Sequence, residues 1–109
     1  MREYKWIIVQ CEGQNEFRCG LVNRHKDLVQ KGENVLGGGL FGVFGNEIDL
    51  FGRSGVFGWA NESAVEGCKE GIVKGLCEFY KAADNVDPRK CRIVWKDCMW
   101  SKHVLQEKS

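Results

Sequence analysis

Two features of this 109-residue chain could together act on an anionic group. The first is His25, whose imidazole can accept a proton or attack as a nucleophile near neutral pH. The second is Ser54, which lies in a glycine-rich segment, residues 52–58, a few residues ahead of a predicted helix. Glycine lets backbone come close to a ligand, and N–H groups ahead of a helix favour an anion. The two features indicate a binding site for phosphate or a similar anion beside one reactive histidine.

The overall composition fits one domain and disfavours two classes of function. Hydrophobic residues make up 43% of the chain, which supports one core in the single domain that we expect over residues 1–109. The 16 basic and 15 acidic residues leave a net charge of +1 with no basic stripe, so a nucleic-acid binder is disfavoured. No apolar run approaches the roughly 20 residues that span a bilayer. The N-terminal segment lacks the apolar region of a signal peptide, so we expect a cytoplasmic protein without membrane contact.

The cysteines do not indicate a metal or thiol chemistry. In a chain without a signal peptide they are expected to be reduced thiols. None forms a C-x-x-C pair, which would favour zinc, and none has the arginine six residues on that a cysteine phosphatase needs. We therefore predict no metal site and no cofactor. The six cysteines are Cys11, Cys19, Cys68, Cys77, Cys91 and Cys98.

The elements that must position these groups follow from periodicity and turn residues. Aromatic and β-branched runs predict strands over residues 4–11, 17–22, 40–44, 47–51 and 91–96. Gly45 and Asn46 are expected to form the turn of a hairpin. Apolar residues three and four apart predict a helix over residues 61–83 that opens with a capping box at Ser63, and a shorter helix is expected over residues 23–31. The polar tail after residue 100 is expected to be frayed. The pattern indicates an α+β domain with a mixed or antiparallel sheet packed with two helices.

Five short segments follow one another in a specific order along nearly the whole chain. They are Lys5 on the first strand, His25-x-Asp27-Leu28, Leu36-Gly37-Gly38-Gly39, Phe51-Gly52-x-Ser54-x-x-Phe57-Gly58, and the final strand Ile93-Val94-Trp95. Each segment alone is weakly informative, but their order and separation are much more specific. In this arrangement the chain resembles the Janus/ocnus family of phosphohistidine phosphatases. That family's fold, a sheet with two helices, agrees with the elements expected above.

The resemblance implies roles for particular residues. His25 would be the essential catalytic residue, and Lys5 would help to bind the phosphoryl group. Backbone N–H groups of Ser54, Gly55 and Val56 would cradle the phosphate, while the triple glycine would allow a tight strand beside the site. The chain would then be a metal-independent, monomeric protein-histidine phosphatase. It would hydrolyse the P–N bond of phosphohistidine in proteins and peptides, with His25 as nucleophile or general base.

The sequence departs from the family pattern near the expected site. Leu40 stands directly after the triple glycine, where the family often has arginine. Arg53 precedes Ser54 where an aromatic residue is common, and Glu62 stands where the best-known member has histidine. Positive charge around the phosphate would be arranged differently, with Arg24 and Arg53 as the candidate replacements and Arg18 as a further one.

These departures keep other functions open. One alternative is a non-catalytic module of the same fold that binds phosphate or a phosphoprotein, and another is a purely regulatory protein. Retention of His25 favours the enzyme, whereas the loss of arginine at Leu40 favours the binding module. Without the resemblance, Lys5 would be a solvent-facing charge on an amphipathic strand and Ser54 an ordinary turn residue.

Overall fold

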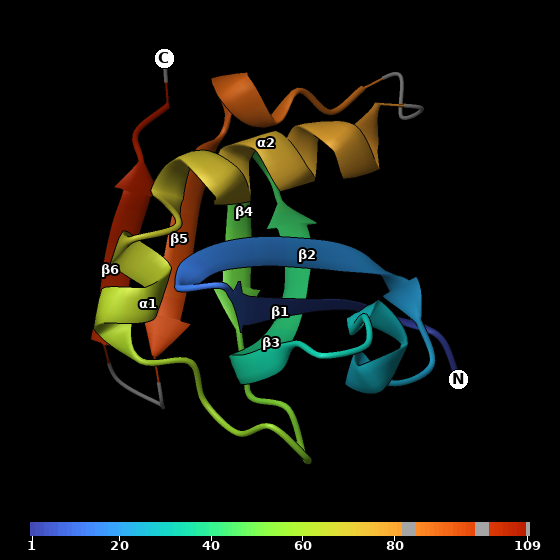
Figure 1. Ribbon diagram of the computed structural model, residues 1–109. Helices are drawn as coiled ribbons and strands as arrows, with labels where there is room; N and C mark the ends of the chain where they lie inside the picture. The colour runs from blue at the N-terminus through green and yellow to red at the C-terminus, as the bar shows by residue number, and fades with distance from the viewer. Residues whose placement is uncertain (82–84, 98–100, 109) are drawn as a thin grey trace.

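One twisted sheet of six strands organises the chain, in the order β2-β1-β3-β4-β5-β6 (Figure 1). The structure, a computed structural model, describes residues 1–81, 85–97 and 101–108. Its strands are β1 (Glu3–Cys11), β2 (Gln14–Val22), β3 (Asn34–Phe44), β4 (Glu47–Phe51), β5 (Arg92–Asp97) and β6 (Ser101–Gln106). Paired strands are antiparallel, except that β4 and β5 run parallel. The expected α+β class with a mixed sheet and two helices is confirmed.

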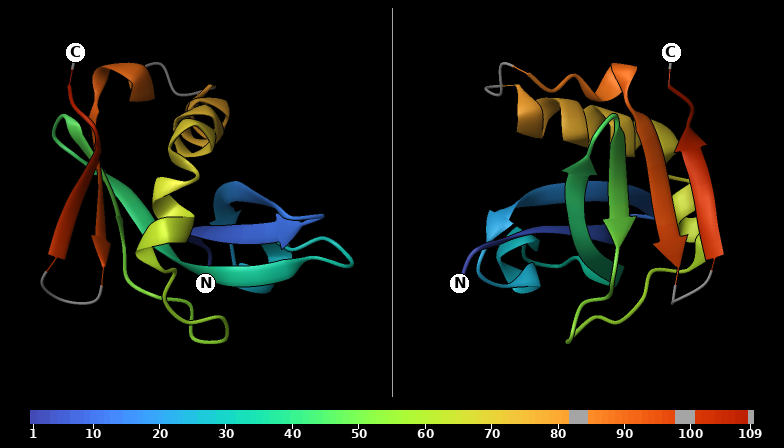
Figure 2. Two further views of the ribbon diagram at one scale, coloured as in Figure 1. Left: turned by 60° about the vertical axis from the view of Figure 1, so that its left-hand side comes forward. Right: turned by 180° about the vertical axis from the view of Figure 1, so that it is seen from behind.

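The parallel pair requires a long crossover, and the helices provide it. Between β4 and β5 the chain forms α1 (Glu62–Glu66), α2 (Lys69–Tyr80) and the 3-10 turn η2 (Pro88–Lys90). Both helices lie against the same face of the sheet, as two further views show (Figure 2). Their apolar side chains and those of alternate strand positions form the main core, which includes Trp6, Ile8, Phe17, Phe41, Ile48, Leu50, Val65, Ile72, Leu76, Ile93 and Trp95.

The opposite face of β1 and β3 is covered by a short segment, η1 (His25–Leu28). Ile7 is fully buried there, although it points away from the helices because strand residues alternate in direction. Two glycines make room for η1. An added Cβ at Gly20 would lie 3.3 Å from Leu28 Cδ2, and one at Gly38 would lie 3.2 Å from His25 Cδ2. This covered face therefore brings His25 directly over the triple glycine.

Two helix predictions are wrong in extent. The helix expected over residues 61–83 breaks at Gly67, where the backbone N–H turns back to Ser63 O and Val65 O, and α2 begins anew after Cys68. The N-cap of α1 is Asn61, whose side chain accepts from Ala64 N, so the predicted capping box at Ser63 is wrong. Residues 82 and 83 lie outside the described residues. The helix expected over residues 23–31 is reduced to η1.

The expected frayed tail is also wrong, because residues 101–106 form β6 at the edge of the sheet. Its polar sequence hides the strand, since Leu105 is its one buried residue. Side-chain contacts fasten it: the His103 ring stacks on Trp95 at 4.9 Å, and the Gln106 amide donates to Cys91 O at 2.9 Å. In the described part of the chain, none of the helices has the length and apolar character needed to cross a membrane.

Candidate functional site

The predicted site residues come together in one cleft of about 380 Å³ on the face covered by η1. All of them line it except Arg53, which is exposed and lies outside the lining. Residues that sequence reasoning did not select also contribute: Asn23, Lys26 and Phe57. Asn23 and Lys26 could have been found, because they flank Arg24 and His25 directly. The lining residues are Lys5, Asn23, Arg24, His25, Lys26, Ser54, Gly55, Val56 and Phe57.

The charge of this cleft is one-sided. Lys5, Arg24 and Lys26 supply three cationic side chains, and the described lining contains no carboxylate. Among the described acids, two outside the lining contact lining residues: Glu3 Oε1 accepts from Lys5 Nζ at 2.9 Å, and Asp27 Oδ2 accepts from the backbone N–H of Arg24 at 3.0 Å. A hollow lined by several cations and one imidazole attracts anions over cations and neutral molecules. The charge of the cleft therefore favours an anionic group.

His25 is held in a defined orientation at the start of η1. Its Nε2 lies 2.8 Å from Gly39 O. A carbonyl oxygen can only accept, so Nε2 carries the hydrogen and Nδ1 of the neutral ring keeps its lone pair. Burial lowers the pKa of His25 below its ordinary value, and the nearby Lys5 ammonium lowers it further, against the opposing effects of the Gly39 carbonyl and Glu3. Near neutral pH the ring can therefore act as a base or nucleophile through Nδ1.

Lys5 is buried rather than facing solvent. Its relative solvent-accessible surface is 6%, and its ammonium group is paired with the Glu3 carboxylate. The Lys5 ammonium lowers the pKa of the Glu3 carboxyl by direct hydrogen bonding. Removing an ammonium from water is unfavourable unless a charged partner replaces the lost hydration. An anion in the cleft would provide such a partner, in competition with Glu3.

The triple glycine joins the two walls of the cleft. It lies inside β3, where Gly38 N–H donates to Gly58 O at 3.2 Å and Gly38 O accepts from Ser54 N at 3.1 Å. At Gly37, where φ is +143°, an added Cβ would lie 2.4 Å from Ala60 N. Backbone of the Ser54 segment thus packs directly on glycine backbone on one side, while His25 packs on it from the other.

Ser54 organises its own loop from within. It is 1% exposed, and its Oγ accepts from Phe57 N at 3.0 Å and from Val56 N at 3.3 Å. Its own N–H is bonded to Gly38 O and Gly58 O. Among the three backbone donors expected to cradle phosphate, Gly55 N–H alone has no acceptor within the described residues. Val56 N–H has a long bond that an anion could replace. The expected cradle is thus reduced to Gly55 and Val56.

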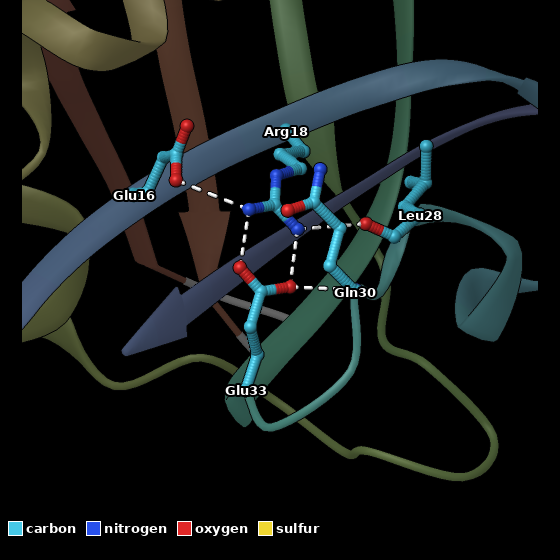
Figure 3. A network of polar contacts seen from close by, with 5 residues as sticks. All are labelled: Glu16, Arg18, Leu28, Gln30 and Glu33. Carbon is cyan, nitrogen blue, oxygen red and sulfur yellow. Dashed lines mark hydrogen bonds and ion pairs between the residues drawn. The ribbon is translucent and has the colours of Figure 1, made fainter. Parts of the chain in front are cut away.

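A network around Arg18 fixes the segment that carries His25 (Figure 3). The guanidinium makes a two-pronged ion pair with Glu33, donates to Leu28 O at 3.0 Å, and contacts Glu16 at 3.1 Å. Glu33 also accepts from Gln30 N at 2.6 Å. Side chains thus bond the carbonyl and N–H groups that a longer helix would use, which explains why η1 ends at Leu28. Arg18 is committed to this network and does not line the cleft.

No protein-family model matches the chain, and the curated proteins and the solved structures contain no match to it either. The similarity to the Janus/ocnus family therefore rests on the ordered sequence segments alone. No cluster of three or more His, Cys, Asp or Glu side chains able to hold a metal ion occurs among the described residues. The cysteines Cys11, Cys19, Cys68, Cys77 and Cys91 are free thiols, and Cys98 lies outside the described residues.

Replacing Ser54 by alanine is expected to loosen the loop more than to weaken anion binding. The substitution leaves Val56 N–H and Phe57 N–H without their acceptor, at a cost of about 1–3 kcal/mol in the free energy of unfolding. Both donors stay available to a bound anion, so the affinity for inorganic phosphate should change little. Urea unfolding and phosphate titration of the variant provide the measurement. A Ser54→Ala protein that is fully stable but no longer binds phosphate would assign the hydroxyl itself to anion binding.

Proposed function

We propose that this chain is a metal-independent protein-histidine phosphatase that hydrolyses the P–N bond of phosphohistidine. One observation carries the proposal: His25, with its Nε2 bonded to Gly39 O and its Nδ1 unprotonated in the neutral ring, lines a cleft that also holds three cationic side chains and, among its described lining residues, no carboxylate. A phosphoryl group is an anion whose transfer depends mainly on positioning and charge stabilisation. The ordered sequence segments shared with the Janus/ocnus family support the same assignment.

The reaction can follow either of two balanced routes. As a general base, Nδ1 takes a proton from water while the water oxygen bonds to phosphorus and the P–N bond breaks. As a nucleophile, Nδ1 bonds to phosphorus first and water then hydrolyses the phosphorylated His25. In the first route the proton held by Nδ1 passes to the leaving imidazole nitrogen, which regenerates the neutral His25. In the second route the leaving nitrogen takes a proton from solvent, and hydrolysis of the phosphorylated ring restores His25. Phosphate is the second product of both routes. Lys5, Arg24 and Lys26 stabilise the phosphoryl oxygens, and the Gly39 carbonyl keeps the hydrogen of the neutral ring on Nε2, so that Nδ1 keeps its lone pair.

The assay is release of inorganic phosphate from a phosphohistidine peptide, with and without a chelator. We expect equal rates in both conditions. A parallel series without enzyme serves as the blank, since phosphohistidine also hydrolyses in water. Loss of activity on chelation would contradict the metal-independent proposal. The second candidate, a non-catalytic phosphate-binding module, would be favoured if no phosphate is released while added phosphate still shifts the amide signals of Gly55 and Val56.

The pH dependence should follow the protonation of His25. Burial favours the neutral ring, so the folded-state pKa lies below the ordinary value of 6.5. The value of kcat/KM should rise with pH through that lowered pKa and level off at neutral pH. Between the two pKa values the unfolded chain binds more protons, so the contribution of His25 to stability is also lost as pH falls. An NMR titration of the His25 ring gives the midpoint directly, and a midpoint above 6.5 would contradict the expected neutral ring.

Replacing Glu3 by glutamine tests how the buried lysine is used. Glu3 currently holds Lys5 Nζ, so an incoming phosphate must compete with a carboxylate for the same ammonium. The Glu3→Gln protein should bind inorganic phosphate more tightly, by a factor of about two to ten, because the Glu3 side chain is half exposed and the ion pair that it makes with the buried Lys5 is therefore partly screened by water. Glu16→Gln is the matched control, since Glu16 is an exposed acid that contacts Arg18 outside the cleft. Weaker phosphate binding by Glu3→Gln would show that Glu3 orients Lys5 rather than competing for it.

A further inference from the structure

A second hollow of about 370 Å³ borders the cleft where β1 separates from β3. Lys5 and Leu40 are the last partners in the β1–β3 register, and the two strands diverge beyond them. The hollow opens at this point. Its walls are mainly apolar and come from β1, β2, β3 and β4: Tyr4, Leu21, Leu40, Phe41 and Phe51, with Arg2 and Glu3 at the side. We call this hollow the apolar groove.

Large apolar side chains remain accessible around the apolar groove. Tyr4 is 47% exposed, Leu21 is 44% exposed, and Phe44, which packs edge-on against Phe51, is 59% exposed. Scattered exposed apolar residues are ordinary, but a group of them around one concave site indicates binding. The core does not need these surfaces, since Leu21, Phe44 and Phe51 lie outside the buried cluster.

The apolar groove and the phosphate cleft have no lining residue in common, but an ion pair joins them. Glu3 lines the groove and its carboxylate holds the ammonium of Lys5, which lines the cleft. Leu40 stands directly opposite Lys5 across the β1–β3 ladder, and Phe51 stands opposite Leu40 across β3–β4. Opposed residues on neighbouring strands point to the same face at a strand spacing of about 4.8 Å. The apolar surface therefore begins one strand away from a cation of the cleft.

We propose that the apolar groove is a substrate subsite that binds an apolar side chain close in sequence to the phosphohistidine of a polypeptide. The inference rests on the proposed function and gives its substrate class. Continuity with the cleft identifies the occupant, because an extended peptide advances only about 3.3 Å per residue. Because Glu3 at the side of the groove contacts Lys5 of the cleft at 2.9 Å, a side chain a few residues from a phosphohistidine in the cleft would lie next to the groove.

The dimensions of the apolar groove favour a side chain over a second protein surface. A stable dimer buries about 800 Å² on each partner, which calls for an extended surface rather than one small hollow. A hollow of about 370 Å³ with aromatic and leucine walls accommodates a single leucine or phenylalanine side chain. Arg2 and Glu3 at the side of the groove offer a hydrogen-bond donor and an acceptor to the backbone of a bound peptide.

Binding of matched peptides tests the inference without requiring turnover. The probes are two peptides with a stable phosphohistidine analogue, one flanked by leucines and one by serines, together with inorganic phosphate. The wild-type protein should bind the leucine peptide about tenfold more tightly, as expected for burial of one apolar side chain. Leu21→Ser and Leu40→Ala should remove most of this preference while leaving the Kd for inorganic phosphate unchanged. Leu21 is already 44% exposed, so its substitution spares the fold even where Leu40→Ala does not.

Val86→Ser is the control, because Val86 lines a separate hollow between α2 and η2. This variant should keep the full preference for the leucine peptide. Equal binding of both peptides by the wild-type protein, or an undiminished preference in Leu21→Ser and Leu40→Ala, would overturn the inference. Concentration-dependent dimerisation that Leu21→Ser abolishes would assign the surface to a second copy instead. Failure to release phosphate from a true phosphohistidine peptide would refute the proposed function and leave the binding preference standing.

Discussion

Replacing His25 by alanine should reduce the rate of phosphate release from a phosphohistidine peptide by at least about 10²–10⁴-fold, the usual contribution of a positioned acid-base group. The substitution removes Nδ1, the one unprotonated ring nitrogen in the cleft, and leaves the cations in place. Affinity for inorganic phosphate should therefore persist, with the loss confined to kcat. The fold should also persist, because His25 is only partly buried and lies outside the main core.

His103→Ala is the matched control, since His103 is the other histidine of the chain. Its ring stacks on Trp95 and its Nε2 lies 3.1 Å from Asp97, away from the cleft lining. This variant should lose some stability but keep its rate of phosphate release. Equal turnover by wild type and His25→Ala would remove His25 from the reaction. Trapping of phosphorylated His25 during turnover would identify it as a nucleophile, and its absence under rapid quenching would favour a general base.

Much of the fold was predictable because its strands carry their own signals. The hairpin of β3 and β4 follows from Gly45 and Asn46 between apolar runs, and β1 follows from its aromatic and β-branched residues. Strand β6 was missed because an edge strand with one buried side chain has no clear alternation. The break in the 61–83 helix was missed because Gly67 fits a helix by period, and the period does not show that its backbone N–H turns back to Ser63 O and Val65 O.

The residues of the site were predictable from the sequence, but their hydrogen bonds and burial were not. Sequence order alone selected His25, Lys5 and Ser54, which the fold brings into one cleft. It could not reveal that Ser54 Oγ occupies two of the loop donors, because such bonds depend on loop conformation. Nor could it reveal the burial of Lys5, since a charged residue on a half-exposed strand normally faces water. Both features depend on contacts between segments that are distant in the sequence or on loop conformation, which the sequence pattern does not show.

The triple glycine is the clearest example, because its role lies in contacts from both sides. Gly38 is predicted to be the position where a single added methyl group damages the whole site. Its Cβ in Gly38→Ala would lie 2.4 Å from Trp6 O and 3.2 Å from His25 Cδ2. The backbone oxygen belongs to a central strand and cannot move freely, so overpacking should lower the free energy of unfolding by about 1–3 kcal/mol or more. The same shift displaces His25 and the hydrogen bonds of Gly38 to Ser54 and Gly58.

Activity of Gly38→Ala should fall further than its stability explains, because a displacement of about 1 Å in a reacting group can cost about 10²-fold in rate. Gly71→Ala is the control: an added Cβ there meets nothing within 4 Å, and alanine in a helix should raise stability by up to about 1 kcal/mol. Both variants are measured by thermal unfolding and by phosphate release at a temperature where each remains folded. A Gly38→Ala protein with wild-type rate would mean that the position of His25 over β3 is not what sets the chemistry. A folded but slow protein would show that the glycine backbone holds the reactive ring in place.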